Sequence, residues 1–210
     1  ITALGSRVCL GLDPRPEFHQ APQGAHPARE HDGAGDAAAV TAHAVAAYCE
    51  HLLDATHDLI ACCKPQSAFF EALGLPGLEA LARVMTHATS LGVPVILDAK
   101  RGDIDSTAAA YAAAYLRGGP FGADALTVNP YLGMDSLEPF ITAAAGADRG
   151  VFALLKTSNP GSVDLQDVAL ASGVPLYRHL AALLAERASL LPHDEHGYSP
   201  LGVVVGATHA

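Results

Sequence analysis

Short runs of apolar residues recur along the chain, and between them lie longer, alanine-rich stretches whose composition favours helices. The runs predict six β-strands, at residues 7–13, 59–64, 94–100, 125–129, 150–157 and 201–208. The stretches between them predict helices at residues 37–54, 77–90, 105–117, 136–145 and 176–191. Because strands and helices alternate, the pattern predicts an α/β fold with a parallel sheet.

The number of strands is small for a closed barrel. A TIM (β/α)8-type barrel takes about 250 residues, whereas this chain has 210 residues and six predicted strands. Either two units are missing or the sheet is open, and the ending at 206–210, which looks like a strand running into a loop, favours an incomplete barrel. We therefore expect one domain over residues 1–210, a (β/α) barrel whose last two β/α units are absent. Residues 14–36, rich in proline, glycine and histidine, are expected to form a long flexible loop after the first strand.

Composition and charge exclude several classes of protein. No apolar run approaches the roughly 20 residues of a membrane-spanning helix, and no basic segment followed by a hydrophobic one stands at the N-terminus, so a soluble, cytoplasmic protein is expected. The formal net charge of −10 argues against a nucleic-acid partner, because binding to a phosphate backbone requires clustered lysine and arginine. The four cysteines and eleven histidines follow no metal-ligand spacing, so we expect reduced thiols and no metal.

All three lysines of the chain stand where an apolar run ends: Lys64, Lys100 and Lys156. A strand that is buried on both faces can carry a charge only at its end, where the sheet opens to solvent or to a ligand. In parallel α/β folds, the carboxyl end of the strands is where active sites are built. The lysines are therefore candidates for chemistry.

The middle lysine belongs to an array of charges, Asp98-Ala99-Lys100-Arg101-Gly102-Asp103. Asp98 and Lys100 are two positions apart on one predicted strand, so both side chains are expected on the same face. Asp103 lies at the corner before the next helix, within reach of its own pocket or of a neighbouring subunit's. A lysine between carboxylates is held protonated and can donate a proton. The alternative is a surface ion-pair cluster at a strand end, which the apolar strand and the scarcity of other lysines disfavour.

Around this array the chain resembles the orotidine 5′-phosphate decarboxylase family, in its bacterial type 2 subgroup. The stretch from Asp98 to Thr107 is similar to the family's Asp-x-Lys-x-x-Asp-Ile-x-x-Thr signature. Four other segments resemble the family in order and spacing: Leu-Gly-Leu-Asp-Pro at 10–14, Lys-Pro-Gln-Ser-Ala-Phe-Phe-Glu at 64–71, Asn-Pro-Tyr-Leu-Gly at 129–133 and Thr-Ser-Asn-Pro-Gly at 157–161.

The resemblance implies a TIM-type barrel that converts orotidine 5′-monophosphate to UMP, the last step of de novo pyrimidine biosynthesis, without a metal or an organic cofactor. It implies a homodimer with shared active sites. In that scheme Lys100 protonates C6 of the pyrimidine and Asp98 lies against the substrate carboxylate. The remaining roles implied are a ribose hydroxyl for Lys64 and for Asp13, the pyrimidine for Ser158, and the partner subunit's site for Asp103, Ile104 and Thr107.

Simpler interpretations of these residues stay open. Asp13 before Pro14 can open a turn, Lys64 can be a strand-end charge whose stem packs on the core, and Ser158 begins a Ser-Asn-Pro-Gly turn. Lys156 is expected to be structural. The family's phosphate-binding segments, a Pro-Gly-x-Gly-x-Gln-Gly loop and a later arginine, have no counterpart in this chain.

Two other functions compete. One is a Mg²⁺-dependent 3-keto-gulonate-phosphate decarboxylase or hexulose-phosphate synthase, which shares the Asp-x-Lys-x-x-Asp array. The other is a non-catalytic nucleotide-binding barrel, which the missing phosphate segments make conceivable.

Overall fold

The protein is described here by a computed structural model that covers residues 5–15, 34–119 and 121–209. These residues form six strands, each overlapping a predicted strand to within one residue at its end, with helices between them, so the predicted α/β alternation is confirmed. The chain divides into two compact units, residues 1–99 and 100–210. In the described part of the chain, no helix combines the length and the apolar character needed to cross a bilayer.

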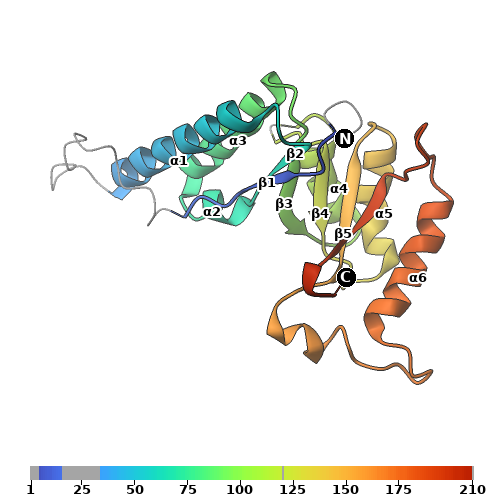
Figure 1. Ribbon diagram of the computed structural model, residues 1–210. Coiled ribbons are helices and arrows are strands. Elements are labelled where there is room, and N and C mark those ends of the chain that lie inside the picture. The colour runs from blue at the N-terminus through green and yellow to red at the C-terminus, as the bar shows by residue number, and fades with distance from the viewer. Residues whose placement is uncertain (1–4, 16–33, 120, 210) are drawn as a thin grey trace. The chain divides into compact units, whose positions relative to one another are not determined.

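The first unit pairs two short strands with helix α3, which contacts β2 and against which α1 and α2 pack (Figure 1). Strand β1 runs parallel to β2, with Cys9 opposite Cys62 and Leu12 opposite Pro65. A side chain at Gly77 would collide with the carbonyl oxygen of Phe70, so this glycine lets α3 start close to α2. In chain order the elements are β1 (Cys9–Leu12), α1 (Ala34–Thr56), β2 (Cys62–Pro65), α2 (Ser67–Glu71), α3 (Gly74–Ser90) and the first part of β3 (Ile96–Arg101).

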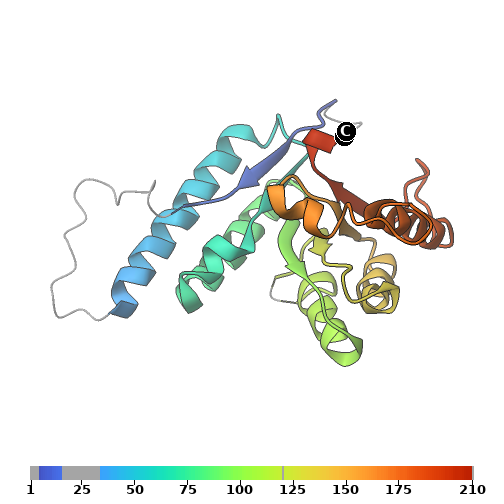
Figure 2. The ribbon, with the colours of Figure 1, turned by 90° about the horizontal axis from the view of Figure 1, so that it is seen from below.

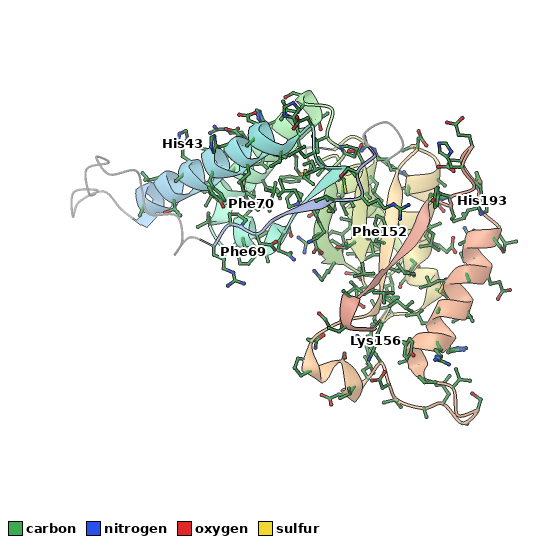
Figure 3. The ribbon with its side chains drawn as sticks, in the orientation of Figure 1. His43, Phe69, Phe70, Phe152, Lys156 and His193 are labelled. Atoms are coloured by element: carbon green, nitrogen blue, oxygen red, sulfur yellow. The ribbon has the colours of Figure 1, made fainter. Side chains whose placement is uncertain are left out.

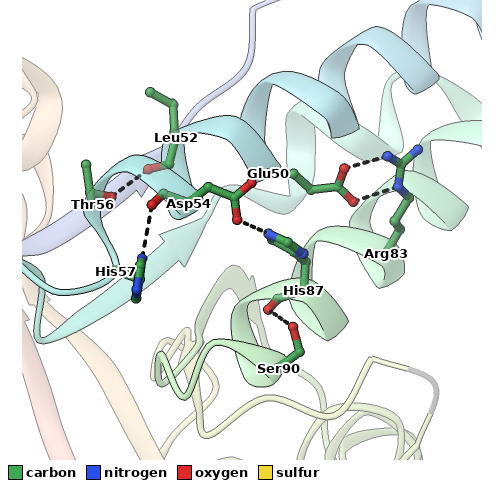
Figure 4. Close-up of polar contacts among 8 residues, drawn as sticks. All are labelled: Glu50, Leu52, Asp54, Thr56, His57, Arg83, His87 and Ser90. Carbon is green, nitrogen blue, oxygen red and sulfur yellow. Dashed lines mark hydrogen bonds and ion pairs between the residues drawn. The ribbon is translucent and has the colours of Figure 1, made fainter.

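Helices α1 and α3 lie side by side and are joined by polar contacts on their outer surface (Figures 2 and 4). The guanidinium of Arg83 donates two hydrogen bonds to the carboxylate of Glu50, at 2.6 and 2.5 Å. His87 Nε2 lies 2.7 Å from Asp54 Oδ1, one turn further along. The hydrogen bonds from Arg83 join two helices that both contribute fully buried residues to the core, among them Val45 on α1 and Val84 on α3.

The second unit contains most of a separate four-stranded sheet, in the order β3, β4, β5, β6. Strand β5 is parallel to both of its neighbours, and its register with β6 shifts between Leu154 and Lys156. The elements are α4 (Asp105–Leu116), β4 (Ala125–Val128), α5 (Met134–Ala145), β5 (Gly150–Lys156), the 3-10 helix η2 (Pro160–Asp164), α6 (Leu176–Ser189), β6 (Leu201–Val205) and η3 (Ala207–His209).

The helices α5 and α6 both pack against β5, and α4 packs against α5 (Figure 1). Arg187 on α6 donates to both carboxylate oxygens of Glu138 on α5, at 2.6 and 2.8 Å. These hydrogen bonds lower the pKa of Glu138. The four residues of β4 are all buried, as expected for a central strand covered on both faces.

Several elements differ from the sequence prediction in their bounds, α1 and α3 among them, and one helix was not predicted. Residues 16–33 of the loop expected at 14–36 lie outside the described residues, and Ala34–Asp36 already belong to α1. Helix α2 was not predicted, because five residues are too few to show helical periodicity. The prediction of a single domain over residues 1–210 stays a prediction.

Candidate active site

The first unit holds one half of the predicted array, on β2 and the first part of β3. Lys64 Nζ donates a hydrogen bond to Asp98 Oδ2 at 2.8 Å. The side chain of Asp98 is only 9% exposed, whereas that of Lys64 is 32% exposed. The carboxylate is thus the fixed member of the ion pair, and the ammonium is the member that solvent or a ligand can approach. The structure therefore joins two of the predicted catalytic residues.

Gln66 is a third member of this group, and the sequence did not single it out. Its Nε2 donates to the same Asp98 Oδ2 at 3.2 Å. Gln66 lies two residues after Lys64, so it shares a face with it in extended backbone, and it bridges to Asp98 across parallel strands. That spacing of two was the available signal. Two donors on one buried oxygen fix the orientation of the Asp98 carboxylate.

Asp13 stands at the same end of the β1–β2 pair. The strands are in register up to Leu12 and Pro65, and Gln66 N donates to Leu12 O at 3.0 Å. Asp13 follows directly and is exposed. A Cβ at Gly11 would lie 3.0 Å from Asp13 Oδ2, so the glycine leaves room for this carboxylate beside the strand. The carboxylate is accessible to a ligand.

Two thiols lie at the amino ends of β1 and β2, the same pair of strands that carries Lys64. Cys9 and Cys62 are opposite each other, and all four cysteines are free, as the sequence predicted. A hydrogen bond from Cys62 lowers the pKa of Cys9 to about 7, against the effect of burial, and the charge of Lys64 lowers it further. The same hydrogen bond raises the pKa of Cys62. The pKa of Cys9 thus depends in part on the charge of Lys64.

In the second unit, Lys100 occupies an unusual backbone position. Its φ angle is +48°, in the left-handed region that non-glycine residues seldom adopt. Its N–H donates to the hydroxyl of Thr127 at 3.0 Å, and Thr127 is 3% exposed on β4. Such strained positions cluster at functional sites. The strand is not extended at Lys100, so the alternation of side chains no longer fixes where this one points.

The residues predicted to reach a partner lie at the corner between β3 and α4. Asp103 Oδ1 accepts a hydrogen bond from Ile104 N at 2.8 Å, which shapes the turn into the helix. Ile104 is 50% exposed although it is a large apolar residue, and Thr107 on the first turn of α4 is exposed as well. All three are therefore accessible at one corner of the second unit.

Ser158 follows β5 and is exposed. A Cβ at Gly206 would lie 3.0 Å from both the Cβ and the N of Ser158, so the end of β6 approaches this serine closely only because residue 206 is glycine. The neighbouring Thr157 is held by Gln166, whose amide accepts from Thr157 N at 2.9 Å and donates to Thr157 Oγ1 at 2.8 Å. Sequence reasoning missed both Thr127 and Gln166.

A cavity of about 600 Å³ lies elsewhere in the second unit. It is bordered mainly by leucines of β5 and α6, together with Asn129, Thr157 and Gln166. None of the predicted site residues lines it. Its mainly apolar walls do not suit a substrate with a carboxylate and a phosphate.

A comparison with protein families decides the relationship. The model of the orotidine 5′-phosphate decarboxylase / HUMPS family matches residues 6–210. The chain belongs to this family. Orotidine 5′-phosphate decarboxylase from Rhodopirellula baltica is 46% identical over 215 residues, which cover 100% of this chain and 68% of that protein. This confirms the resemblance drawn from the Asp98–Thr107 signature.

Solved structures agree with the family. The structure of Leishmania donovani OMP decarboxylase matches with a TM-score of 0.72 and 39% identity, over 98% of this chain and 68% of that chain. Plasmodium berghei orotidine 5′-monophosphate decarboxylase has a TM-score of 0.79 at 20% identity, over 99% and 74%, and so shares the fold. The fold class is that of the family's TIM barrel. The chain spans about two thirds of the length of the relatives it matches.

Proposed function

We propose that the protein decarboxylates orotidine 5′-monophosphate to UMP, the last step of de novo pyrimidine biosynthesis. The observation that carries the proposal is the buried Asp98 carboxylate, held by Lys64 and Gln66, two residues before Lys100 in the family signature. Membership of the family supports the proposal, and the relatives from Rhodopirellula baltica and Roseiflexus sp. are named as this decarboxylase.

The chemistry requires a cation at the carbon that loses its carboxylate. The bond from C6 to the carboxylate breaks, carbon dioxide leaves, and the electron pair stays on C6. That pair takes a proton from the Lys100 ammonium, and the resulting amine regains a proton from water. An ammonium aimed at C6 stabilises the developing carbanion more than the substrate, which is how it lowers the barrier. No metal or organic cofactor enters this sequence of steps.

The other residues bind and orient the substrate in this proposal. The 32% exposure of Lys64 suits contact with a ribose hydroxyl, and the exposed Asp13 suits a second hydroxyl. Asp98 faces the departing carboxylate. Ser158, on the loop after β5, contacts the pyrimidine.

The active form in this proposal is a homodimer with shared sites. Asp103, Ile104 and Thr107 enter the partner's site, and the exposure of Ile104 and Thr107 supports this role, because a half-exposed isoleucine gains from burial against a second subunit. The site works in the cytoplasm, where pyrimidine nucleotides are made.

Loss of the orotate ring's ultraviolet absorbance tests the activity directly. Lys100→Ala should lower kcat by at least about 10³-fold, as expected when the central proton donor is removed. Arg117→Ala, which removes an exposed cation at the other end of α4, should leave the rate unchanged. A Lys100→Ala enzyme that keeps most of its rate contradicts the assignment.

The same assay separates the two competing functions. Activity that survives EDTA excludes the Mg²⁺-dependent reaction. Binding of UMP by a wild-type protein that turns over no orotidine monophosphate would instead indicate the non-catalytic nucleotide-binding barrel.

A further inference from the structure

Lys156, which the proposed mechanism does not use, is the buried lysine of the chain's described part. Its residue exposure is 4%, and Figure 3 shows it at the end of β5, beside the segment that leads into η2. Its Nζ donates to Asp167 Oδ1 at 2.8 Å and to Ser162 Oγ at 3.3 Å. The ammonium also lies 5.6 Å from the centre of the Tyr177 ring. A buried ammonium is retained only where such partners compensate its desolvation.

The hydrogen-bonding partners of Lys156 come from one loop. Ser162 and Asp167 belong to the segment between β5 and α6 that begins with Thr157 and Ser158. Ser162 is itself buried, and its carbonyl accepts from Gln166 N at 2.8 Å. The loop is thus tied to the strand end through Lys156 and folded back on itself through Gln166.

Gln166 joins the end of the loop to its beginning. Its amide makes two hydrogen bonds to Thr157, one to the backbone and one to the hydroxyl, in the manner of a neighbouring strand. On the far side, Gly206 N donates to Lys156 O at 2.7 Å, and Gly206 leaves no space beside Ser158. The backbone of Ser158 is therefore fixed from both sides.

We propose that Lys156 is a positioning residue, whose buried ammonium draws the 157–167 loop onto the end of β5 and so sets Ser158 against the pyrimidine. The inference rests on the proposed function for the identity of the ligand. It does not make Lys156 a catalytic residue, because Asp167 and Ser162 occupy its ammonium and the side chain is only 5% exposed.

The test compares two ligands that share a phosphate and a ribose and differ in the base. Lys156→Met keeps the length of the side chain and removes its charge, and the 40% exposed Asp167 can then be hydrated, so the fold should survive. We expect the affinity for UMP and 1/KM for orotidine monophosphate to fall about tenfold, the effect of losing one hydrogen bond. The affinity for ribose 5-phosphate and kcat should stay within about twofold.

Two further variants separate positioning from general stability. Lys156→Arg should restore UMP binding, because a cavity of about 220 Å³ lined by Lys156, Asp167 and Tyr177 has room for a guanidinium. Glu138→Gln breaks the Arg187–Glu138 pair in the same unit without touching the loop, and it should change neither affinity. If Lys156→Met does not fold, Gln166→Met gives the same comparison, since it releases Thr157 and leaves Lys156 in place.

Hydrogen exchange provides a readout that needs no ligand. The amides of Thr157 and Gln166 should exchange faster in Lys156→Met than in wild type, and Glu138→Gln should leave them unchanged. Unchanged exchange, or equal changes in the affinities for UMP and ribose 5-phosphate, would overturn the inference. A wild-type protein that neither turns over orotidine monophosphate nor binds UMP would overturn the proposed function, and exchange alone would then decide whether Lys156 holds the loop.

Discussion

Two strand-end lysines of this chain are paired with carboxylates in opposite ways. In the first unit the carboxylate is buried and the lysine open: Asp98 is 9% exposed and Lys64 32%. In the second unit the lysine is buried and the carboxylate open: Lys156 is 5% exposed and Asp167 40%. The two ion pairs have the same length, 2.8 Å. Distance alone does not distinguish them.

The difference shows which partner is available for chemistry. A buried charge that is saturated by its neighbours serves the fold, because moving it would expose an uncompensated group. A partly exposed charged side chain that is held by a buried partner can bind a substrate in place of water. On this basis Lys64 is suited to bind a ligand and Lys156 to hold a loop, although both end apolar strands in the sequence.

The largest expected difference between the two pairs is in their carboxylates. Asp98→Asn should lower kcat by about 10³-fold, since it removes a charge beside the reacting centre while keeping the shape. Asp167→Asn should change kcat by less than about tenfold, because it acts only through Lys156 and the loop. Steady-state kinetics of the two variants measure this contrast. Equal losses of kcat would mean that burial does not separate the roles.

A second prediction concerns how Lys100 is held. Thr127→Val removes the hydroxyl that accepts from Lys100 N and keeps the volume of the side chain. The left-handed backbone at Lys100 then loses a partner, and displacement of its ammonium should lower kcat by about 10- to 100-fold. Thr127→Ser should keep most of the rate.

The chain's few lysines make the displacement visible without turnover. After reductive methylation with ¹³C, the three lysines give separate dimethylamine signals in NMR spectra. Thr127→Val should move the signal of Lys100 and leave those of Lys64 and Lys156 in place. Ser136→Ala, which removes another buried hydroxyl of the second unit, is the matched control.

Sequence reasoning located the strands and the charged residues at their ends, because both follow from hydrophobic runs and from the ends of those runs. The pattern of apolar runs could not by itself separate Lys64 from Lys156, and only the family resemblance gave them different roles, since the burial of Lys156 depends on Asp167, which lies 11 residues further along an irregular loop. The positive φ angle of Lys100 could not be predicted from the sequence either, because the alternation of side chains presumes extended backbone. The hydrogen bond between Gln166 and Thr157 joins residues nine positions apart, and no periodic pattern in the sequence predicts it.

The smallest expected effect uses Cys9 to report on the open lysine. A hydrogen bond from Cys62 is the main reason that the pKa of Cys9 is lowered to about 7, and the charge of Lys64 contributes to the lowering. Lys64→Met removes that charge, so the pKa of Cys9 should rise. The thiolate is the reactive form, so alkylation of Cys9 by iodoacetamide at pH 7 should become slower.

Mass spectrometry of alkylated peptides over a range of pH gives the midpoint for Cys9 in each variant. Lys156→Met should leave that midpoint unchanged, because the charges that shift the pKa of Cys9 are those of Lys64 and Asp98. Cys49 is the internal control: burial raises its pKa to about 12, so it should stay unmodified at neutral pH in every variant. A Cys9 midpoint that is the same with and without Lys64 would show that this ammonium is screened by solvent, and the open lysine would then hold substrate by hydrogen bonding more than by charge.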